Sequence, residues 1–239
     1  MSIEMSSGPA LDVRWREHAL NVGLALSAVR YVPRVPKAMP EDLFRGVDDL
    51  EISMRHDVRA RSLPHGEAYV LSLITAAVQP GRIFEIGTAS GQATLLMARQ
   101  APNAAIDTID LGNDVPSLGT QVGEPPWVDL STIGLAWRDT PFAERITQHF
   151  ADSATFDYGP FREQIDLVFI DGAHTYDYVK SDTRAAMAML TPGGVIVWDD
   201  CNYVCPGVSK LLVELRAAGH QVHRIYGTRF GAFRAPATA

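Results

Sequence analysis

IDLVFID at residues 165–171 and VIVWDD at residues 195–200 are apolar runs that each end in carboxylates. Runs of β-branched and aromatic residues bounded by turn residues are typical of strands buried on both faces, as in a parallel sheet. Ligands bind beyond the carboxyl ends of the strands in open α/β sheets. Carboxylates gathered there repel one another unless a positive charge neutralises them, and Mg²⁺ prefers oxygen ligands of this kind. We therefore expect Asp171, Asp199 and Asp200 to form a small metal site at the rim of a nucleotide-binding fold.

Expected strands and helices alternate along the chain from residue 82 onward. Strands are expected at 83–86, 105–110, 145–150, 165–171 and 195–198, helices at 92–99, 176–190 and 208–218, and a terminal hairpin at 221–234. An earlier helix is expected after Ser62, with Pro64 in its first turn. This alternation predicts βαβ units, a mostly parallel sheet and an α/β fold class.

Two segments interrupt this pattern. Residues 1–61 are expected to hold a disordered tail, an amphipathic helix at 14–30 and a proline-punctuated linker, so this segment could cap the site or mediate a homodimer. Residues 111–144 are too long for an ordinary connection. They are interpreted either as a lid-like insertion beside the site or as an insertion that only packs on the surface. The remaining residues, 62–239, are expected to form the main domain.

Composition narrows the function classes. The 239 residues are 46% hydrophobic and carry a net charge of −7, with a pI near 5.4. General binding to nucleic acid or to an anionic membrane surface needs clustered Lys and Arg, so neither is expected. Cys201 and Cys205 are too few for a disulfide scaffold and are expected to be plain packing or loop residues. The chain opens without a charged-then-apolar leader and has no apolar run near ~18 residues, so a soluble cytoplasmic protein is expected.

The loop EIGTASG at residues 85–91 follows the first expected strand and opens a helix. Gly87 permits a sharp turn and a close backbone approach to a ligand, and Gly91 permits close contact at the helix start. Asp110 ends the next strand, where an acidic side chain can bind ribose hydroxyls. The glycine spacing is not that of dinucleotide enzymes, whose pyrophosphate needs a helix N-terminus. A positively charged sulfonium nucleoside beside Glu85 is the better match.

Four segments together resemble a known family: FEIGTASG at 84–91, ADS at 151–153, FIDGAH at 169–174 and PGGVIVWDD at 192–200. Their order and spacing are similar to those of class I S-adenosylmethionine-dependent O-methyltransferases, most of all the catechol and caffeoyl-CoA branch and related bacterial natural-product enzymes. The resemblance covers roughly residues 62–200. It implies a Rossmann-like methyltransferase fold: a mostly parallel seven-stranded sheet with a C-terminal antiparallel hairpin and helices on both faces.

The resemblance also implies roles for individual positions. Glu85 and Gly87 would lie along the methionine part of the cofactor, Asp110 at the ribose, and Asp152 and Ser153 by the adenine. The full set of expected S-adenosylmethionine-binding residues is Glu85, Gly87, Thr88, Ser90, Gly91, Asp110, Asp152, Ser153 and Asp171.

Asp171, Asp199 and Asp200 fall where this branch holds a divalent metal, expected to be Mg²⁺. The last pair is usually Asp-Asn in the family, so either Asp200 is a ligand or Asn202 takes that role. His174 falls where the catechol enzyme carries a lysine base, which makes Asp171 and His174 the expected catalytic residues. The competing interpretations are that Asp171 caps a helix or turn and that His174 is structural.

The leading hypothesis is a metal-dependent O-methyltransferase that acts on a hydroxyl of a small molecule such as a natural product, a sugar or a phenol. A second hypothesis is a metal-independent N- or O-methyltransferase whose aspartates hold substrate amines; sensitivity to EDTA separates the two. A third is a cofactor-binding regulatory protein that has lost catalysis.

Overall fold

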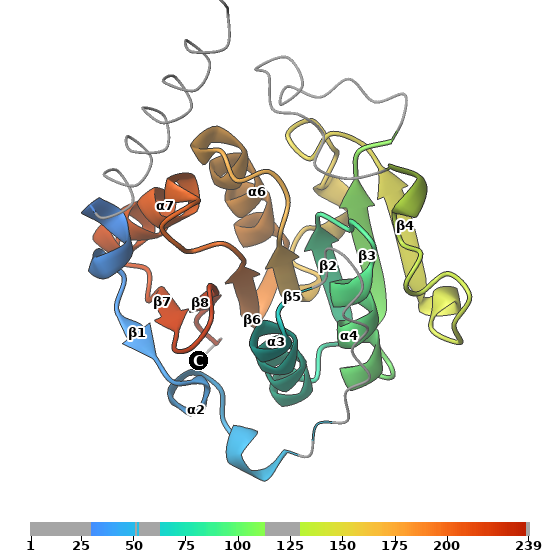
Figure 1. The fold of residues 1–239 in the computed structure, drawn as a ribbon, viewed down its shortest axis with the longest axis horizontal. Coiled ribbons are helices and arrows are strands. Elements are labelled where there is room, and N and C mark those ends of the chain that lie inside the picture. Colours follow the sequence, from blue (N-terminus) through green and yellow to red (C-terminus); the bar gives the residue numbers. More distant parts are fainter. Residues whose placement is uncertain (1–29, 51, 53–62, 113–129, 238–239) are drawn as a thin grey trace, which may run out of the picture.

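The computed structural model describes residues 30–50, 52, 63–112 and 130–237. Its centre is a sheet of eight strands in the order β1-β7-β8-β6-β5-β2-β3-β4 (Figure 1). The strands are β1 (Lys37–Ala38), β2 (Arg82–Ile86), β3 (Ala105–Asp110), β4 (Ile146–Phe150), β5 (Ile165–Ile170), β6 (Leu190–Trp198), β7 (His223–Ile225) and β8 (Gly231–Arg234).

The pairing confirms the expected fold class. Strands β2 to β6 run parallel to one another, and β8 lies antiparallel to both β6 and β7, forming the C-terminal hairpin. The sheet has one strand more than expected, because β1 adds in parallel to the edge at β7. β1 has two residues and lies between Pro36 and Pro40, so its sequence carries no alternating pattern that would reveal it.

Helices cover both faces of the sheet, as expected. The described α-helices are α2 (Pro40–Leu43), α3 (His65–Val78), α4 (Gln92–Gln100), α6 (Tyr176–Met189) and α7 (Pro206–Ala217), and the short 3-10 helices are Val32–Arg34, Val47–Asp49, Leu130–Thr132, Ala143–Arg145 and Gly159–Phe161. Leu167 and Phe169 of β5 belong to the core that includes α3 and α4. Val168 and Ile170 belong to the core that includes α6 and α7. β5 is apolar from Leu167 to Ile170 because both of its faces are buried there.

The strand order reverses between β2 and β5, which is where ligands bind in open α/β sheets. Backbone hydrogen bonds continue past the strand ends: the Asp171 amide donates to Ile86 O at 2.8 Å, and the Asp199 amide donates to Ile170 O at 2.9 Å. Gly87, Asp171 and Asp199 are therefore held at the same edge of the sheet.

Several expectations concern residues outside the described part of the chain. The helix expected at 14–30 and most of the expected lid lie there, so the cap, the dimer contact and the domain boundary at residue 62 stay predictions. Within the described part, β1 shows that residues before 62 contribute to the sheet. None of the described helices is long and apolar enough to span a membrane.

Gly87 is the backbone position most sensitive to a side chain. It has a φ of +98°, and a Cβ placed there would lie 2.1 Å from the carbonyl oxygen of Asp171. Gly193 has a φ of +80° with nothing within 4 Å of the same position, so it is a matched control. We expect Gly193→Ala to lose about 1 kcal/mol for its positive φ. We expect Gly87→Ala to lose at least about 3 kcal/mol and to bind S-adenosylmethionine weakly, because the strand ends must separate.

Denaturant unfolding and calorimetric titration of the cofactor measure both effects. Equal losses of stability in the two variants would contradict the close approach of residue 87 to the end of β5.

Candidate active site

The glycine loop at residues 85–91 is enclosed from one side by residues 130–139. The amides of Gly134 and Ala136 donate to the carbonyl oxygens of Ala89 and Ser90, each at 2.9 Å. Gly91 has a φ of +81°, and a Cβ there would lie 2.5 Å from the Trp137 ring. The end of the expected insertion is thus packed directly on the predicted cofactor loop.

Glu85 is fully buried beneath this loop. Its Oε2 accepts hydrogen bonds from the hydroxyls of Thr94 and Thr108, while Oε1 has no partner among the described residues. Burial raises the pKa of Glu85 to about 8, despite those two hydrogen bonds. A buried carboxyl of this kind can balance a sulfonium charge nearby, because a positive group favours its ionised form.

Asp110 closes the loop from the end of β3. Its Oδ2 accepts from the Ala89 amide and its Oδ1 accepts from the Leu111 amide, both at 2.7 Å. Thr88 lies in the same loop, and its expected contact with the cofactor stays a prediction. Its side chain is buried, and its hydroxyl lies 2.6 Å from the Thr108 hydroxyl and accepts from Gln148, so it braces the sheet.

Asp152 and Ser153 follow β4 at the neighbouring strand end. Asp152 is buried and accepts hydrogen bonds from the Tyr178 hydroxyl and the Ala154 amide, each at 2.9 Å. Behind it lies Asp182 of α6, which is fully buried. A Cβ on Gly172 would lie 3.7 Å from its Oδ2. A second acidic pair therefore lies under the loop that carries Asp171 and His174.

The expected metal ligands do converge. Asp171, Asp199 and Asp200 each offer a carboxylate oxygen, and these oxygens lie within 4.8 Å of one another. Burial, reinforced by the other two carboxylates, raises the pKa of Asp171 well above its usual value. Burial and the Asp200 carboxylate also raise the pKa of Asp199 to about 7. This acidic trio is thus held in mutual repulsion that a cation would relieve.

Arg229 partly compensates the trio from the turn between β7 and β8. Its guanidinium donates to Asp200 Oδ1 at 2.8 Å and contacts Asp199 Oδ2 at 3.5 Å. The same guanidinium forms a two-point pair with Glu67 of α3, with both donor–acceptor distances at 2.8 Å. One positive charge is therefore shared among three carboxylates.

His174 lies against the trio. Its Nε2 is 2.6 Å from Asp200 Oδ2 and 3.9 Å from Asp171 Oδ1. Burial alone would raise the pKa of Asp200, but its contacts with His174 and Arg229 outweigh burial and lower that pKa below its usual value. Asp200 has a φ of +58°, a conformation that Asp and Asn tolerate better than other non-glycine residues.

The alternative ligand, Asn202, braces the loop instead of facing the trio. Its side-chain oxygen accepts from the amides of Val204 and Cys205, at 2.6 and 3.0 Å, and its amide nitrogen donates to Asp200 Oδ1 at 2.8 Å. Its oxygen is thus engaged by the backbone, which favours Asp200 as the third oxygen donor.

Comparison with known proteins agrees with this geometry. Residues 84–201 match the protein family described as a methyltransferase domain. Catechol O-methyltransferase B of Danio rerio is 26% identical over 191 residues, which cover 77% of this chain and 67% of that protein. The chain is a class I S-adenosylmethionine-dependent O-methyltransferase.

Solved structures of other O-methyltransferases share its fold. TomG of Streptomyces achromogenes, solved with SAM, superposes with a TM-score of 0.54 at 16% identity, covering 85% of this chain and 92% of that one. The O-methyltransferase of Bacillus cereus, in complex with SAH, gives a TM-score of 0.50 at 16% identity, covering 82% and 98%.

Sequence reasoning missed several residues of this methyltransferase's site. Glu67 and Arg229 are far apart in sequence and belong to no motif, so only the fold could bring them to the trio. Trp137 was expected only as part of the insertion, yet its ring rests on Gly91. Cys205 was interpreted as a plain loop or packing residue, although its sulfur lies beside His174 and Asp200. A glutamate in the first turn of the otherwise apolar α3 was the one available signal.

Asp182 gives the methyltransferase a testable pH dependence. Burial raises its pKa from 3.8 to about 7, and the Asp152 carboxylate adds to the shift. The folded state therefore holds this proton more tightly than the unfolded chain does, and the stability it contributes is lost as pH rises from about 4 to about 7. Asp182→Asn keeps the shape without the charge. We expect it to stabilise the protein at pH 8 by up to ~4 kcal/mol and to have little effect at pH 4.

Thermal unfolding across this pH range measures the difference, with Asp177→Asn on the exposed face of α6 as the control. A gain in Tm that does not depend on pH would show that folding does not shift the ionisation of Asp182.

Proposed function

We propose that this enzyme is a divalent-cation-dependent O-methyltransferase that methylates a hydroxyl of a small molecule. The observation that carries the proposal is the convergence of Asp171, Asp199 and Asp200, whose carboxylate oxygens lie within 4.8 Å of one another at the ends of β5 and β6. An all-oxygen set suits a hard cation such as Mg²⁺.

The residues fit a cation by their electrostatics as well as by their spacing. Arg229 forms ion pairs with Asp199 and Asp200, but the same guanidinium also pairs with Glu67. Among the described ion pairs, Asp171 has no arginine or lysine partner of its own. The raised pKa of Asp171 means that, without further positive charge, the trio resists full ionisation. A divalent cation bound there would supply charge that stabilises a developing oxyanion on the acceptor.

We assign the cofactor to the glycine loop beside the trio. Gly87 lies directly against the Asp171 carbonyl, so the loop and the proposed cation site lie side by side. Glu85 would face the methionine end, Asp110 the ribose, and Asp152 with Ser153 the adenine. Gly91 and Ser90 would line the same loop. S-adenosylmethionine supplies a methyl group that its sulfonium charge has already activated.

In this proposal His174 is the general base. Methyl transfer forms the acceptor O–C bond as the C–S bond breaks in line with it, and the acceptor proton passes to the imidazole. Asp200, 2.6 Å from Nε2, orients the ring and stabilises the imidazolium that forms. The reaction then leaves S-adenosylhomocysteine and a protonated His174, which returns its proton to solvent.

The acceptor is proposed to be a natural product, a sugar or a phenol. The acidic trio suits an acceptor with a hydroxyl that can approach oxygen ligands closely. Tyr176 begins α6 two residues after His174, and Tyr203 lies in the loop that follows Asp200. Their rings suit an acceptor with an apolar or aromatic body.

One observation favours a metal-independent reaction. Arg229 already contacts Asp199 and Asp200, so a single bound proton on Asp171 would leave the trio with one net negative charge when Glu67 is set aside. In that case the aspartates would hold a substrate amine or hydroxyl directly. Sensitivity of turnover to EDTA decides between the two reactions.

Replacing Asp171 tests the cation site. We expect turnover of the wild-type enzyme to fall on treatment with EDTA and to recover with Mg²⁺. We expect Asp171→Asn to lower kcat at least about 100-fold and to abolish stimulation by Mg²⁺, because the ligand set loses a charge. Cofactor affinity, measured by calorimetry, should change little. Asp177→Asn is the control. Wild-type turnover that EDTA leaves unchanged would favour the metal-independent reaction.

Replacing His174 tests the base. We expect His174→Gln to lower kcat by about 10² to 10⁴ and to remove the dependence of kcat on an ionisation near neutral pH, since glutamine cannot accept the proton. The pH profiles of kcat and kcat/KM measure this. A lower rate with an unchanged profile would make His174 a positioning residue, and an unchanged rate would exclude it from the reaction.

A further inference from the structure

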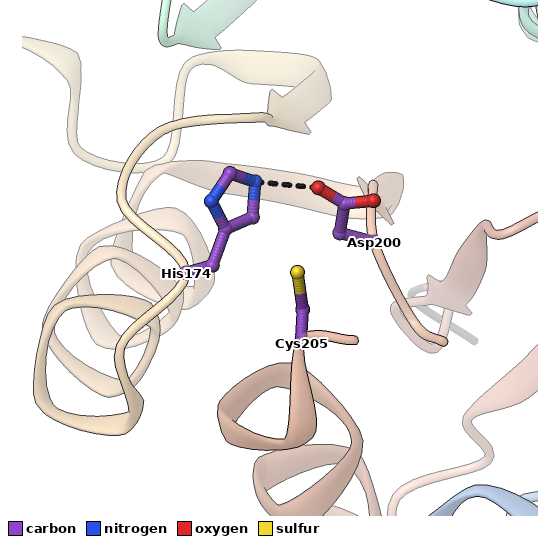
Figure 2. Close-up of side chains that lie close together, drawn as sticks. All are labelled: His174, Asp200 and Cys205. Atoms are coloured by element: carbon purple, nitrogen blue, oxygen red, sulfur yellow. Dashed lines mark ion pairs between the residues drawn. The ribbon is translucent and has the colours of Figure 1, made fainter. Parts of the chain in front are cut away.

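A second set of potential metal ligands lies beside the acidic trio and shares one residue with it. His174, Asp200 and Cys205 each offer a ligand atom, and these atoms lie within 4.8 Å of one another. Figure 2 shows the three side chains pointing toward a common point from different segments: the loop after β5, the end of β6 and the start of α7. This set is defined as the His-Asp-Cys cluster.

The donor atoms of the cluster differ in kind from those of the trio. One imidazole nitrogen, one carboxylate oxygen and one sulfur are the donors that Zn²⁺ and related thiophilic cations take, and three protein ligands leave a fourth position open. Mg²⁺ has little affinity for sulfur. We propose that the His-Asp-Cys cluster is a binding site for Zn²⁺ or a similar thiophilic divalent cation, distinct from the all-oxygen site of the trio.

The backbone holds the three ligands together. A Cβ on Gly207, in the first turn of α7, would lie 2.5 Å from the carbonyl oxygen of His174, so only glycine lets the helix start pack this closely on the His174 loop. Asn202 accepts from the Cys205 amide and donates to Asp200 Oδ1, which fixes Cys205 relative to Asp200. Arg229 holds the same Oδ1, so Oδ2 is the oxygen that faces the cluster.

Small movements admit the cation. Neighbouring ligand atoms around a tetrahedral zinc ion are about 3.3 Å apart, so the 2.6 Å contact between His174 Nε2 and Asp200 Oδ2 must open slightly. As the Sγ–metal bond forms, the Cys205 thiol loses its proton to solvent, so binding tightens as pH rises. No oxidant or reductant takes part.

Occupation of the cluster has a consequence for catalysis that rests on the proposed function. A ligated His174 nitrogen has no lone pair left for the acceptor proton, and Asp200 is drawn from the trio. The cluster is therefore an inhibitory site: a thiophilic cation and the productive arrangement of His174 exclude each other. Binding itself does not depend on the proposed function.

Cobalt substitution tests the site directly. Co²⁺ is titrated into the full-length protein, with a phosphine reductant present, and the thiolate-to-cobalt charge-transfer absorption in the near ultraviolet is recorded. The chain has two cysteines, so a thiolate-to-cobalt band can come only from Cys201 or Cys205. We expect the band in wild type and in Cys201→Ser, whose site is a buried thiol beside Ser209, and its loss in Cys205→Ser. Circular dichroism confirms that each variant is folded.

Zn²⁺ competition completes the test. We expect Zn²⁺ to displace Co²⁺ and remove the band, to bind Cys205→Ser at least about 10-fold more weakly, and to inhibit wild type more than Cys205→Ser at saturating Mg²⁺. Absence of the band in wild type, or its persistence in folded Cys205→Ser, overturns the site whatever Zn²⁺ does to turnover. A Cys205-dependent band without inhibition supports the site and overturns His174 as the base.

Discussion

Mutual repulsion among three carboxylates is the constraint around which this edge of the sheet is organised. The parallel register fixes Asp171 against the end of β2 and Asp199 against the end of β5. The backbone segments that carry the two aspartates therefore cannot move apart. Partial burial of Asp171 and burial of Asp199 limit the screening of their charges by water, and the pKa values of both rise as a result. The trio must therefore bind a proton, an arginine or a cation, and each choice sets a different chemistry for the site.

The cofactor loop and the acidic trio depend on each other through one glycine. Gly87 lies so close to the Asp171 carbonyl that any side chain would part β2 from β5 at their carboxyl ends. The same contact brings Glu85 near enough to Asp171 for its charge to contribute to the raised pKa of that aspartate. In the proposed function, a methyl donor in the loop and an acceptor at the trio would therefore lie side by side because of backbone packing, before any ligand binds.

Local sequence patterns predicted the strands that carry the site. They did not predict the residues and the edge strand that only long-range contacts bring into place. Strands β3, β5 and β6 were predicted within a residue or two at their carboxyl ends, because their apolar runs end abruptly at aspartates. Glu67 and Arg229 come from the first helix of the domain and the last turn of the sheet, and nothing local relates them. The short edge strand β1 was missed for the same reason: its partner β7 alone makes it a strand.

The two carboxylate oxygens of Asp200 hold different neighbouring side chains. The branch that this chain resembles usually has asparagine there, and the positive φ of Asp200 accommodates either residue. An asparagine would carry an NH₂ donor in place of the second acceptor oxygen. Asp200 accepts from Arg229 at Oδ1 and meets His174 at Oδ2, so the second carboxylate oxygen is what allows a histidine to be held at this edge. Asp200 therefore belongs to both the trio and the His-Asp-Cys cluster, and its two oxygens connect a titratable nitrogen to the cation site.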